Sequence, residues 1–338
     1  MSAAPLRVGV LGTGRIGRMH AELIARRVPG GTLAAVYDVD GGAAATVSGN
    51  LGVPTARDVH ELIGSPDVDA VAICTSTETH VELIEAAAAT GKAIFCEKPI
   101  AQDLALVDRA LSAVERAGVL FMVGFNRRFD PAHRSVHDAV ASGAVGDVHI
   151  LRITSRDPEP PPASYVRVSG GIFRDMTIHD FDIARYVTGS DVLEVTARGA
   201  VRVDPVFAEA SDVDTAVVVV THVNGALTVI DNSRRAVYGY DQRVEAFGSA
   251  GVAASENVPA HTGVVRTAAG LSGPSLAYFF LERYLQSYIG EWTAFVAAAR
   301  EGGASPVSGA DGRAALVAAL AADRSLREQR AVAIAEVA

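Results

Sequence analysis

The first 124 residues alternate short apolar runs with segments of helical periodicity. The apolar runs are typical of buried strands, and they cover 6–11, 32–37, 70–73, 93–96 and 120–124. Between them, apolar residues recur every three to four positions, which predicts helices over 15–27, 41–50, 80–90 and 101–117. Strands that alternate with helices predict a doubly wound parallel sheet in an α/β domain of residues 1–124.

Beyond residue 124 the pattern becomes richer in strands. The proline run 158–162 can continue neither a helix nor a central strand. Strands are predicted over 147–155, 191–203, 215–223, 226–233 and 242–248, and helices over 131–142, 175–187, 277–301 and 312–329. Asn224-Gly225 predicts a hairpin turn between two of the strands. We therefore expect a second domain, 125–338, of the α+β class with an antiparallel sheet.

The composition is that of an ordinary globular chain, with 49% apolar and 20% charged residues. Residues 1–124 hold 10 basic and 14 acidic side chains and the remainder 20 and 25, so neither half is the basic module that non-specific nucleic-acid binding needs. No apolar stretch approaches the ~20 residues that span a bilayer, and the first residues lack the layout of a signal peptide. We expect no nucleic-acid partner, no membrane insertion and a cytoplasmic protein.

Cysteine and lysine are both scarce. Cys74 and Cys96 are too few for a disulfide framework or a four-cysteine zinc site, and both lie in apolar runs typical of a core. The chain has 28 arginines but only two lysines, Lys92 and Lys98. A lysine that remains in such a chain can mark a position that needs a compact ammonium group.

The first strand is followed by Gly-Thr-Gly-Arg-Ile-Gly, which fits the dinucleotide-binding pattern G-x-G-x-x-G. In such a turn Gly12 permits a tight bend, Gly14 lets the backbone approach a pyrophosphate, and Gly17 lets helix and strand pack closely. The helix start, with Arg15 and Ile16, would face the anion. A plain glycine-rich turn is the alternative.

Asp38 ends the second strand, 21 residues after Gly17. An acidic residue there commonly bonds the ribose 2′-hydroxyl and repels a 2′-phosphate, which predicts NAD rather than NADP as cofactor. Asp40 could share or take over this role. A solvated turn carboxylate is the alternative interpretation.

Glu97-Lys98-Pro99 follows the fourth strand, at the carboxyl edge where such sheets bind ligands. We expect Glu97 and Lys98 to contact the cofactor. The proline stiffens the backbone next to Lys98, whose ammonium could bond a substrate oxygen and favour its deprotonation. A surface lysine at a strand end is the alternative.

Asp175 and His179 are four residues apart, which places them on one face of a predicted helix. A histidine beside a carboxylate can act as a general base. A helix acid near a core histidine, or a pair of metal ligands, are the alternatives; further ligands are not evident, so we expect no metal. Asp157 and the cluster 238–243, with Tyr238, would suit a polyol, and a turn with packing tyrosines is the alternative.

Together these residues resemble the Gfo/Idh/MocA family of nicotinamide oxidoreductases over nearly the whole chain. The resemblance rests on the glycine turn, Asp38, Glu97-Lys98-Pro99, the segment 124–130 (Gly-Phe-Asn-Arg-Arg-Phe-Asp) and the Asp175/His179 pair. Within the family, the similarity is greatest to members that oxidise inositol, over 169–182, 238–243, 247–249 and 280–284.

The resemblance implies an N-terminal Rossmann domain and a C-terminal domain whose open, mainly antiparallel sheet mediates oligomers, hence a homotetramer or homodimer. It implies NAD-dependent oxidation of a ring secondary alcohol of myo-inositol, or of a close cyclic polyol, to the ketone. His179 would remove the hydroxyl proton, Asp175 would orient it, and Lys98 would stabilise the alkoxide. Asn126 and Arg127 fall in the segment near the nicotinamide, as expected substrate contacts.

Two alternatives stay open. The proline run 158–162 and the segment 260–273 depart from the family pattern, so another inositol isomer, a sugar or a dihydrodiol could be the substrate. A non-catalytic NAD sensor is the alternative from another class. Such a sensor would not need a lysine, an aspartate and a histidine together.

Overall fold

The computed structural model describes residues 4–338, which form two compact units. Unit 1 runs to Asn126 and includes Ser287–Ala314, and unit 2 contains Arg127–Gln286 and Ala315–Ala338. The sequence places all of 125–338 in one domain, whereas helix α11 (Leu285–Glu301) packs mainly in unit 1. The reason is aromatic packing. Trp292 and Phe295 of α11 are fully buried, and their rings lie 4.5 and 5.9 Å from that of Phe95 in strand β4 (Ala93–Glu97).

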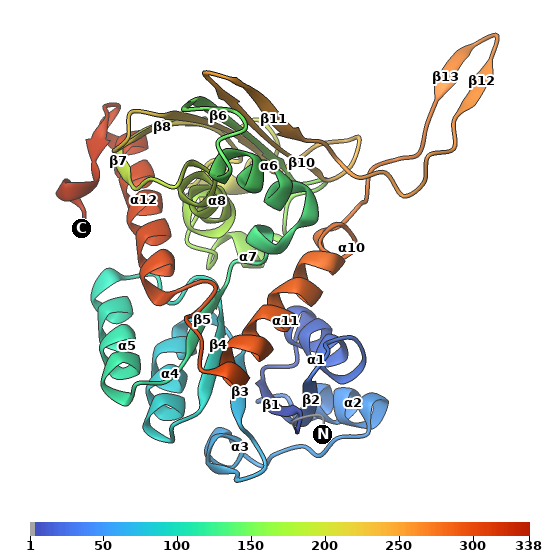
Figure 1. Cartoon of the computed structure of the whole chain (residues 1–338), viewed down its shortest axis with the longest axis vertical. Helices are drawn as coiled ribbons and strands as arrows, with labels where there is room; N and C mark the ends of the chain where they lie inside the picture. The colour runs from blue at the N-terminus through green and yellow to red at the C-terminus, as the bar shows by residue number, and fades with distance from the viewer. Residues whose placement is uncertain (1–3) are drawn as a thin grey trace. The chain divides into compact units, whose positions relative to one another are not determined.

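The sheet of unit 1 consists of parallel strands in the order β2-β1-β3-β4-β5 (Figure 1). Besides β4, these are β1 Leu6–Leu11, β2 Gly31–Tyr37, β3 Ala70–Ile73 and β5 Phe121–Gly124. This confirms the doubly wound parallel sheet. The strand order reverses between β1 and β3, and ligands of such sheets bind outside the carboxyl ends of the strands at this point.

Helices connect these strands, and capping side chains set where they begin. The helical segments are α1 Arg15–Arg26, α2 Gly41–Leu51, α3 Val59–Gly64, η1 Thr77–Thr79, α4 His80–Ala89 and α5 Leu104–Ala117. Helix α5 begins three residues later than predicted because the Asp103 carboxylate accepts the N–H groups of Ala105 and Leu106. Helix α3, missed in the sequence, has a similar cap from Asp58 to the Glu61 N–H.

One of the two lysines has a structural explanation. The Nζ atom of Lys92 donates to the carbonyl oxygens of Ser65, at 2.8 Å, and Val68, at 2.5 Å. These carbonyls lie between α3 and β3, where they have left the helix and not yet entered the sheet. A compact ammonium with three donors suits two converging carbonyls. Lys92 therefore has a structural role.

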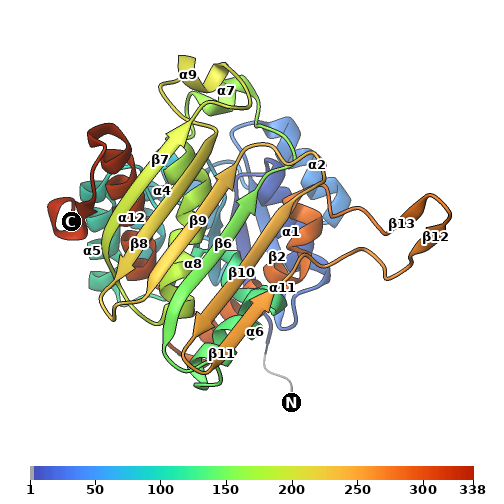
Figure 2. The same ribbon diagram turned by 90° about the horizontal axis from the view of Figure 1, so that it is seen from above.

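Unit 2 is built on a mixed sheet with the order β11-β10-β6-β9-β8-β7-β14 (Figure 2). Strands β6 and β9 pair parallel and the other neighbours antiparallel, which confirms the mainly antiparallel sheet. The strands are β6 Val148–Arg156, β7 Val192–Ala200, β8 Thr215–His222, β9 Leu227–Ser233, β10 Asp241–Gly248, β11 Gly251–Ser255 and β14 Val332–Ala333. The predicted Asn224-Gly225 turn joins β8 to β9, with Gly225 at φ +90°.

One face of this sheet is packed and the other is exposed. Helices α6 (Pro131–Ala141) and α8 (Ile178–Thr188) contact the packed face, and alanines 318, 319, 321 and 322 of α12 (Gly309–Glu328) join the same core. Along β8 the side chains alternate between core and solvent. The exposed large apolar residues of this sheet are Leu193, Val217, Val219, Leu227, Phe247 and Val252.

The remaining elements, which apart from Asn126 lie in unit 2, are short. They are η2 Asn126–Phe129, α7 Ala163–Val166, the π-helical turn η3 Phe173–Thr177, α9 Val206–Glu209, α10 Phe280–Arg283 and η4 Ile334–Glu336. Strands β12 (Val265–Thr267) and β13 (Gly270–Ser272) form a hairpin that extends from unit 2 (Figures 1 and 2). Over residues 4–338, none of the helices combines the length and apolarity that crossing a bilayer requires.

Candidate active site

The glycine turn after β1 is tightly packed at two glycines and open at the third. A Cβ on Gly12, whose φ is +88°, would come within 2.6 Å of the Cys74 carbonyl oxygen. A Cβ on Gly17 would come within 1.9 Å of the Gly12 carbonyl oxygen, so α1 could not pack against the turn. At Gly14 a Cβ would meet none of the described atoms within 4 Å. The protein itself does not demand glycine there, which fits a ligand that approaches this backbone.

Helix α1 begins at this turn without an anionic cap. Gly14 is its N-cap residue, no side chain caps it, and its first turn contains no acidic residue. The first N–H groups of a helix lack intrahelical partners and carry the positive end of the helix dipole. The start of α1, with Arg15 and Ile16, therefore suits a pyrophosphate.

Asp38 at the end of β2 is tied to the glycine turn. Its Oδ2 atom accepts the N–H of Thr13 at 2.5 Å and the Thr13 hydroxyl at 3.0 Å, and Oδ1 accepts the N–H of Asp40 at 2.9 Å. Burial alone would raise the pKa of Asp38, but these hydrogen bonds outweigh it and lower the pKa. Asp40 instead caps α2 through the N–H groups of Gly42 and Ala43. This arrangement favours Asp38 over Asp40 for a ribose.

The end of β4 is held from inside unit 1. The Glu97 side chain is only 14% exposed; its Oε1 lies 2.7 Å from Nε2 of His20, and Oε2 accepts the N–H of Lys98 at 3.2 Å. Gly124 leaves room for this carboxylate, because a Cβ there would lie 3.3 Å from Oε1. Lys98 is half-buried and precedes Pro99 through a cis peptide bond. Contacts of Glu97 and Lys98 with a cofactor stay predictions.

Asn126 follows β5 and is almost fully buried. Its Nδ2 atom has no hydrogen-bond partner within residues 4–338. Leaving a buried amide donor without a partner costs free energy. This side chain therefore fits the predicted role of Asn126 as a ligand contact.

Asp175 lies in the π-helical turn η3 rather than in a regular helix. Helix α8 begins three residues later than predicted, so the shared helical face of Asp175 and His179 stays a prediction. Gly170 and Gly171 lead into this turn with φ of +85° and +87°, a conformation that favours glycine. Turns of this kind are frequent at functional sites. Among the described side chains, no group of three or more His, Cys, Asp or Glu could hold a metal ion.

Arg234, which sequence reasoning missed, joins two of the predicted site carboxylates. Its buried guanidinium donates to Oδ2 of Asp175 at 2.7 Å and to Oδ2 of Asp157 at 3.2 Å. The hydroxyl of Tyr165 donates to the other oxygen of Asp175 at 2.8 Å. Burial raises the pKa of Asp157, and Arg234 opposes this rise. The only sequence signal for Arg234 is its place directly after a predicted strand, near the cluster 238–243.

Arg127, an expected substrate contact, is engaged within unit 2. Its buried guanidinium donates to Oδ1 of Asp180 at 2.6 Å and to the Ser155 hydroxyl at 3.2 Å. Burial raises the pKa of Asp180 to about 6, and the charge of Arg127 opposes the rise. A substrate contact by Arg127 stays a prediction, but its pairing gives it a structural role.

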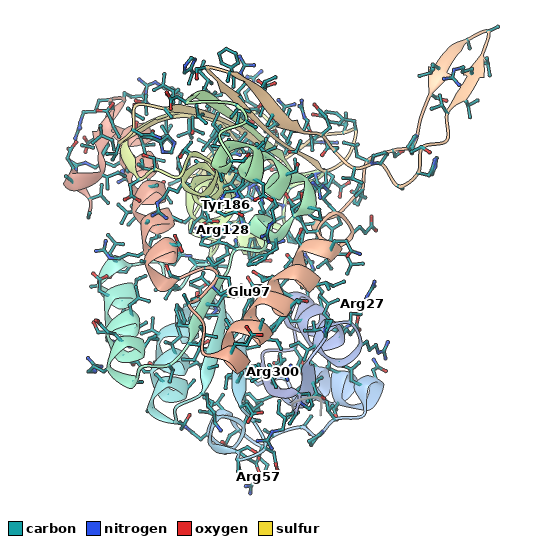
Figure 3. The ribbon with its side chains drawn as sticks, viewed as in Figure 1. Arg27, Arg57, Glu97, Arg128, Tyr186 and Arg300 are labelled. Atoms are coloured by element: carbon teal, nitrogen blue, oxygen red, sulfur yellow. The ribbon has the colours of Figure 1, made fainter. Side chains whose placement is uncertain are left out.

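Arg128 forms a second pair of the same kind. Its Nε and Nη2 atoms donate to the two carboxylate oxygens of Asp182 at 2.8 and 2.5 Å. The guanidinium also lies over the ring of Tyr186, 5.2 Å from its centroid (Figure 3). Two successive arginines of η2 are thereby fastened to two aspartates of α8.

Tyr238 is half exposed and takes part in a hydrogen-bonded group of its own. Its hydroxyl donates to Oδ2 of Asp241 at 2.8 Å and accepts from Nη1 of Arg156 at 2.8 Å. The group joins the facing ends of β6 and β10. A substrate contact by Tyr238 stays a prediction.

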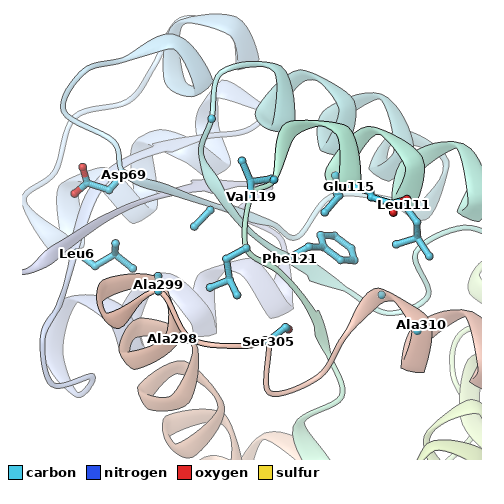
Figure 4. A pocket seen from close by; sticks show the side chains of 18 residues that line it. Leu6, Asp69, Leu111, Glu115, Val119, Phe121, Ala298, Ala299, Ser305 and Ala310 are labelled. Atoms are coloured by element: carbon cyan, nitrogen blue, oxygen red, sulfur yellow. The ribbon is translucent and has the colours of Figure 1, made fainter.

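A hollow of about 750 Å³ in unit 1 lies away from all these residues (Figure 4). Leu6, Ala93 and Phe121, at or near the starts of β1, β4 and β5, line it. It therefore lies at the amino edge of the sheet, whereas ligands bind at the carboxyl edge. Its Asp69 is already paired with Arg7 at 2.9 Å. We assign no function to it.

Comparison with protein families identifies both halves of the chain. A model described as an oxidoreductase family with an NAD-binding Rossmann fold matches residues 6–125, and a GFO/IDH/MocA C-terminal domain matches 133–254. The chain belongs to the Gfo/Idh/MocA family of oxidoreductases. This confirms the resemblance seen in the sequence. The cofactor is of the NAD type, and the open Gly14, the uncapped start of α1 and the anchored Asp38 fit it.

Individual relatives are similar over almost their full length. The myo-inositol 2-dehydrogenase of Thermotoga maritima is 50% identical over 98% of this chain and 99% of its own. The inositol 2-dehydrogenase of Rhizobium meliloti is 45% identical over 98% and 99%. A solved scyllo-inositol dehydrogenase of Lactobacillus casei, with NAD(H) and scyllo-inositol bound, has a TM-score of 0.91 and 29% identity over 98% of this chain and 99% of that one.

The three glycines of the turn predict two different kinds of defect. Gly14→Ala meets no steric obstacle from the protein, so we expect normal thermal stability but NADH binding weaker by about tenfold or more. Gly17→Ala forces α1 away from the turn, so we expect a stability loss of about 1–3 kcal/mol. Thermal unfolding and NADH fluorescence titration measure the two effects. Unchanged NADH affinity in Gly14→Ala would contradict ligand approach at this backbone.

Glu291 of α11 is a buried carboxyl group in the same unit. It is fully buried, and neither side-chain oxygen has a hydrogen-bond partner within the described part of the chain. Burial raises the pKa of Glu291 well above 4.5, and the charge of Glu97 raises it further. Burial therefore favours the neutral form of this carboxyl group.

This neutral carboxyl predicts a pH-dependent stability effect. Above the ordinary pKa of 4.5 the unfolded chain loses the Glu291 proton and the folded chain keeps it, so stability falls as pH rises toward the folded pKa. Glu291→Gln removes this loss. The variant should gain about 1.4 kcal/mol relative to wild type for each pH unit of that window. Urea unfolding from about pH 4 to pH 8 measures it; a gain that does not change with pH would contradict a neutral Glu291.

Proposed function

We propose that this protein is an NAD-dependent dehydrogenase that oxidises a ring secondary alcohol of myo-inositol, or of a close cyclic polyol, to the ketone. The observation that carries the proposal is full-length similarity, at 45–50% identity, to inositol 2-dehydrogenases. A fold by itself does not fix a substrate, so the polyol follows from these relatives. Binding of a dinucleotide is supported by the glycine turn, the start of α1 and the Asp38 carboxylate of unit 1.

The cofactor would be held by residues of unit 1. The backbone of the glycine turn and the start of α1 would bind the pyrophosphate, and Asp38 the ribose. When bound, the nicotinamide supplies a hydride acceptor. Glu97 and Asn126 are the further expected contacts, one anchored by His20 and the other a buried donor without a protein partner among residues 4–338.

The proton chemistry is assigned to Lys98, Asp175 and His179. His179 takes the hydroxyl proton as general base, and Lys98 stabilises the alkoxide as it forms. Asp175 stabilises the resulting imidazolium. It is suited to this task because Arg234 and Tyr165 each donate a hydrogen bond to one of its oxygens. Such bonds favour the carboxylate form.

Fewer observations support the substrate contacts assigned to Asp157, Tyr238 and Arg127. Asp157 shares Arg234 with Asp175, which supports its place at the site. Tyr238 and Arg127 are each engaged by protein partners. The proline run 158–162 leads into α7, from which Tyr165 contacts Asp175. This segment is where another inositol isomer or sugar would be distinguished.

Assembly and location also stay predictions. We expect a homotetramer or homodimer in the cytoplasm. The apolar side chains on the open sheet face, such as Val217, Val219 and Leu227, would gain free energy by burial against a second copy.

The reaction is tested by following NADH absorbance with a panel of inositol isomers and aldoses, using NAD and NADP in parallel. Turnover of an inositol in preference to aldoses would support the proposal. NAD binding without turnover of any polyol would instead support the sensor interpretation.

Removing the Lys98 ammonium should abolish most turnover. We expect Lys98→Met to lower kcat by about 10²–10⁴-fold with NAD affinity largely kept, and His179→Ala to behave alike. Lys92→Met is the matched control, because it removes the other lysine, which serves backbone carbonyls, and should lose stability but not turnover. Steady-state kinetics and NAD titration separate the effects. Wild-type kcat in Lys98→Met or His179→Ala would reject the mechanism.

Asp38 should set the cofactor preference. Asp38→Ser removes the charge that repels a 2′-phosphate, so the ratio of kcat/KM for NAD over NADP should fall by about tenfold or more. The matched control is Asp40→Ser, which removes a neighbouring charge that caps α2. An unchanged ratio in Asp38→Ser, or an equal change in the control, would mean that another residue distinguishes the two cofactors.

A further inference from the structure

A hydrogen-bonded chain crosses the core of unit 1 and ends at the last residue of β4. The indole Nε1 of Trp292 donates to Nδ1 of His20 at 2.8 Å, and Nε2 of His20 lies 2.7 Å from Oε1 of Glu97. Trp292 and His20 are both fully buried. Water therefore does not compete for these bonds.

The indole decides which tautomer His20 adopts. An indole N–H can only donate, so Nδ1 of His20 must accept and carries no hydrogen. The ring hydrogen is then on Nε2 and is donated to Glu97. His20 thus acts as a neutral donor, and Glu97 is the acceptor at the end of the chain.

The surroundings of His20 contain several other titratable groups. Glu97 faces it from β4. The ring centroid of Tyr288 in α11 lies 5.6 Å from that of His20, and the ring centroid of Phe95 in β4 lies 5.3 Å from it. Cys74 and Glu291 lie near Glu97, and burial raises the pKa of both well above the ordinary value, which favours their neutral forms. Of these acidic groups, Glu97 is the one that bonds to His20.

We propose that His20 and Trp292 are positioning residues, which act by fixing the Glu97 carboxylate at the end of β4. One oxygen of Glu97 is held by His20 and the other holds the backbone N–H of Lys98, at 3.2 Å. Two bonds at opposite oxygens prevent rotation of the carboxylate and so fix the backbone from which Lys98 extends. The inference rests on the proposed function, because Lys98 is assigned there to the reaction.

Trp292→Phe tests the chain at its remote end, because it keeps an aromatic ring and removes the donor. We expect kcat to fall about 5–10-fold, the effect of one net hydrogen bond, with KM for the polyol little changed. The apo-protein should also lose stability. Steady-state kinetics measures the two constants, and urea unfolding of the apo-protein measures the stability loss.

Two further variants separate positioning from packing. Phe295→Leu disturbs the same aromatic cluster, with its ring 5.4 Å from Trp292, and keeps the donor, so it should lose stability but keep kcat. His20→Gln removes the acceptor of the indole, so adding Trp292→Phe to it should lower kcat no further. A further loss in the double variant, or a kcat in Trp292→Phe no lower than in Phe295→Leu, would overturn the proposal. Full activity in Lys98→Met would instead overturn the proposed function.

Discussion

A charge buried inside a protein must be paired, and in unit 2 this requirement fixes the elements that carry the candidate site. Arg127 and Arg128 meet Asp180 and Asp182 in a setting that excludes water. Removing one partner of such a pair typically costs about 3–5 kcal/mol, because the other charge stays buried. The position of α8 is therefore set by electrostatics as well as by its apolar side. The turn η3, which contains Asp175 and directly precedes α8, is positioned together with this helix.

The hydrogen bonds of Asp180 extend to the sheet and to η3. Asn232 of β9 donates to the second oxygen of Asp180 at 2.8 Å and accepts the Thr177 hydroxyl at 2.6 Å. Thr177 is the last residue of η3, so strand, π-helical turn and helix share one network. A network with every member bonded fixes a single arrangement more narrowly than apolar packing does. This explains how an irregular turn can hold its carboxylate in one place.

Local signals explain what could be predicted from the sequence. Glycines, caps and apolar periodicity act within a few residues, so the parallel strands of unit 1, strands β6 to β10 of unit 2 and the hairpin at Gly225 were within reach. The short edge strands β11 and β14 were not predicted. The roles of Arg234, His20 and Trp292 could not be predicted, because these residues bond to partners that are distant in the sequence. Trp292, for example, lies 272 residues from His20. The return of α11 to unit 1 was hidden for the same reason.

Scarcity of lysine was an informative but incomplete signal. It applied equally to both lysines, and their different surroundings in the structure distinguish their roles. Lys92 binds two backbone carbonyls between α3 and β3. Lys98 follows a strand at the carboxyl edge, where ligands of such sheets bind. A compact ammonium is useful in both settings, so residue type alone could not separate a structural role from a chemical one.

Glu97 and Asp175, the two carboxylates assigned to the proposed site, are held within their own units by different kinds of donor. Glu97 is held by a neutral donor, which leaves its charge uncancelled. Asp175 is held by Arg234, which also pairs with Asp157. With both aspartates ionised, one cation faces two anions, and a negative charge remains to stabilise an imidazolium. Burial, which raises the pKa of Asp157, works against that surplus. In the proposed mechanism, the protonation state of Asp157 would therefore set how much of the charge of Asp175 is available to His179.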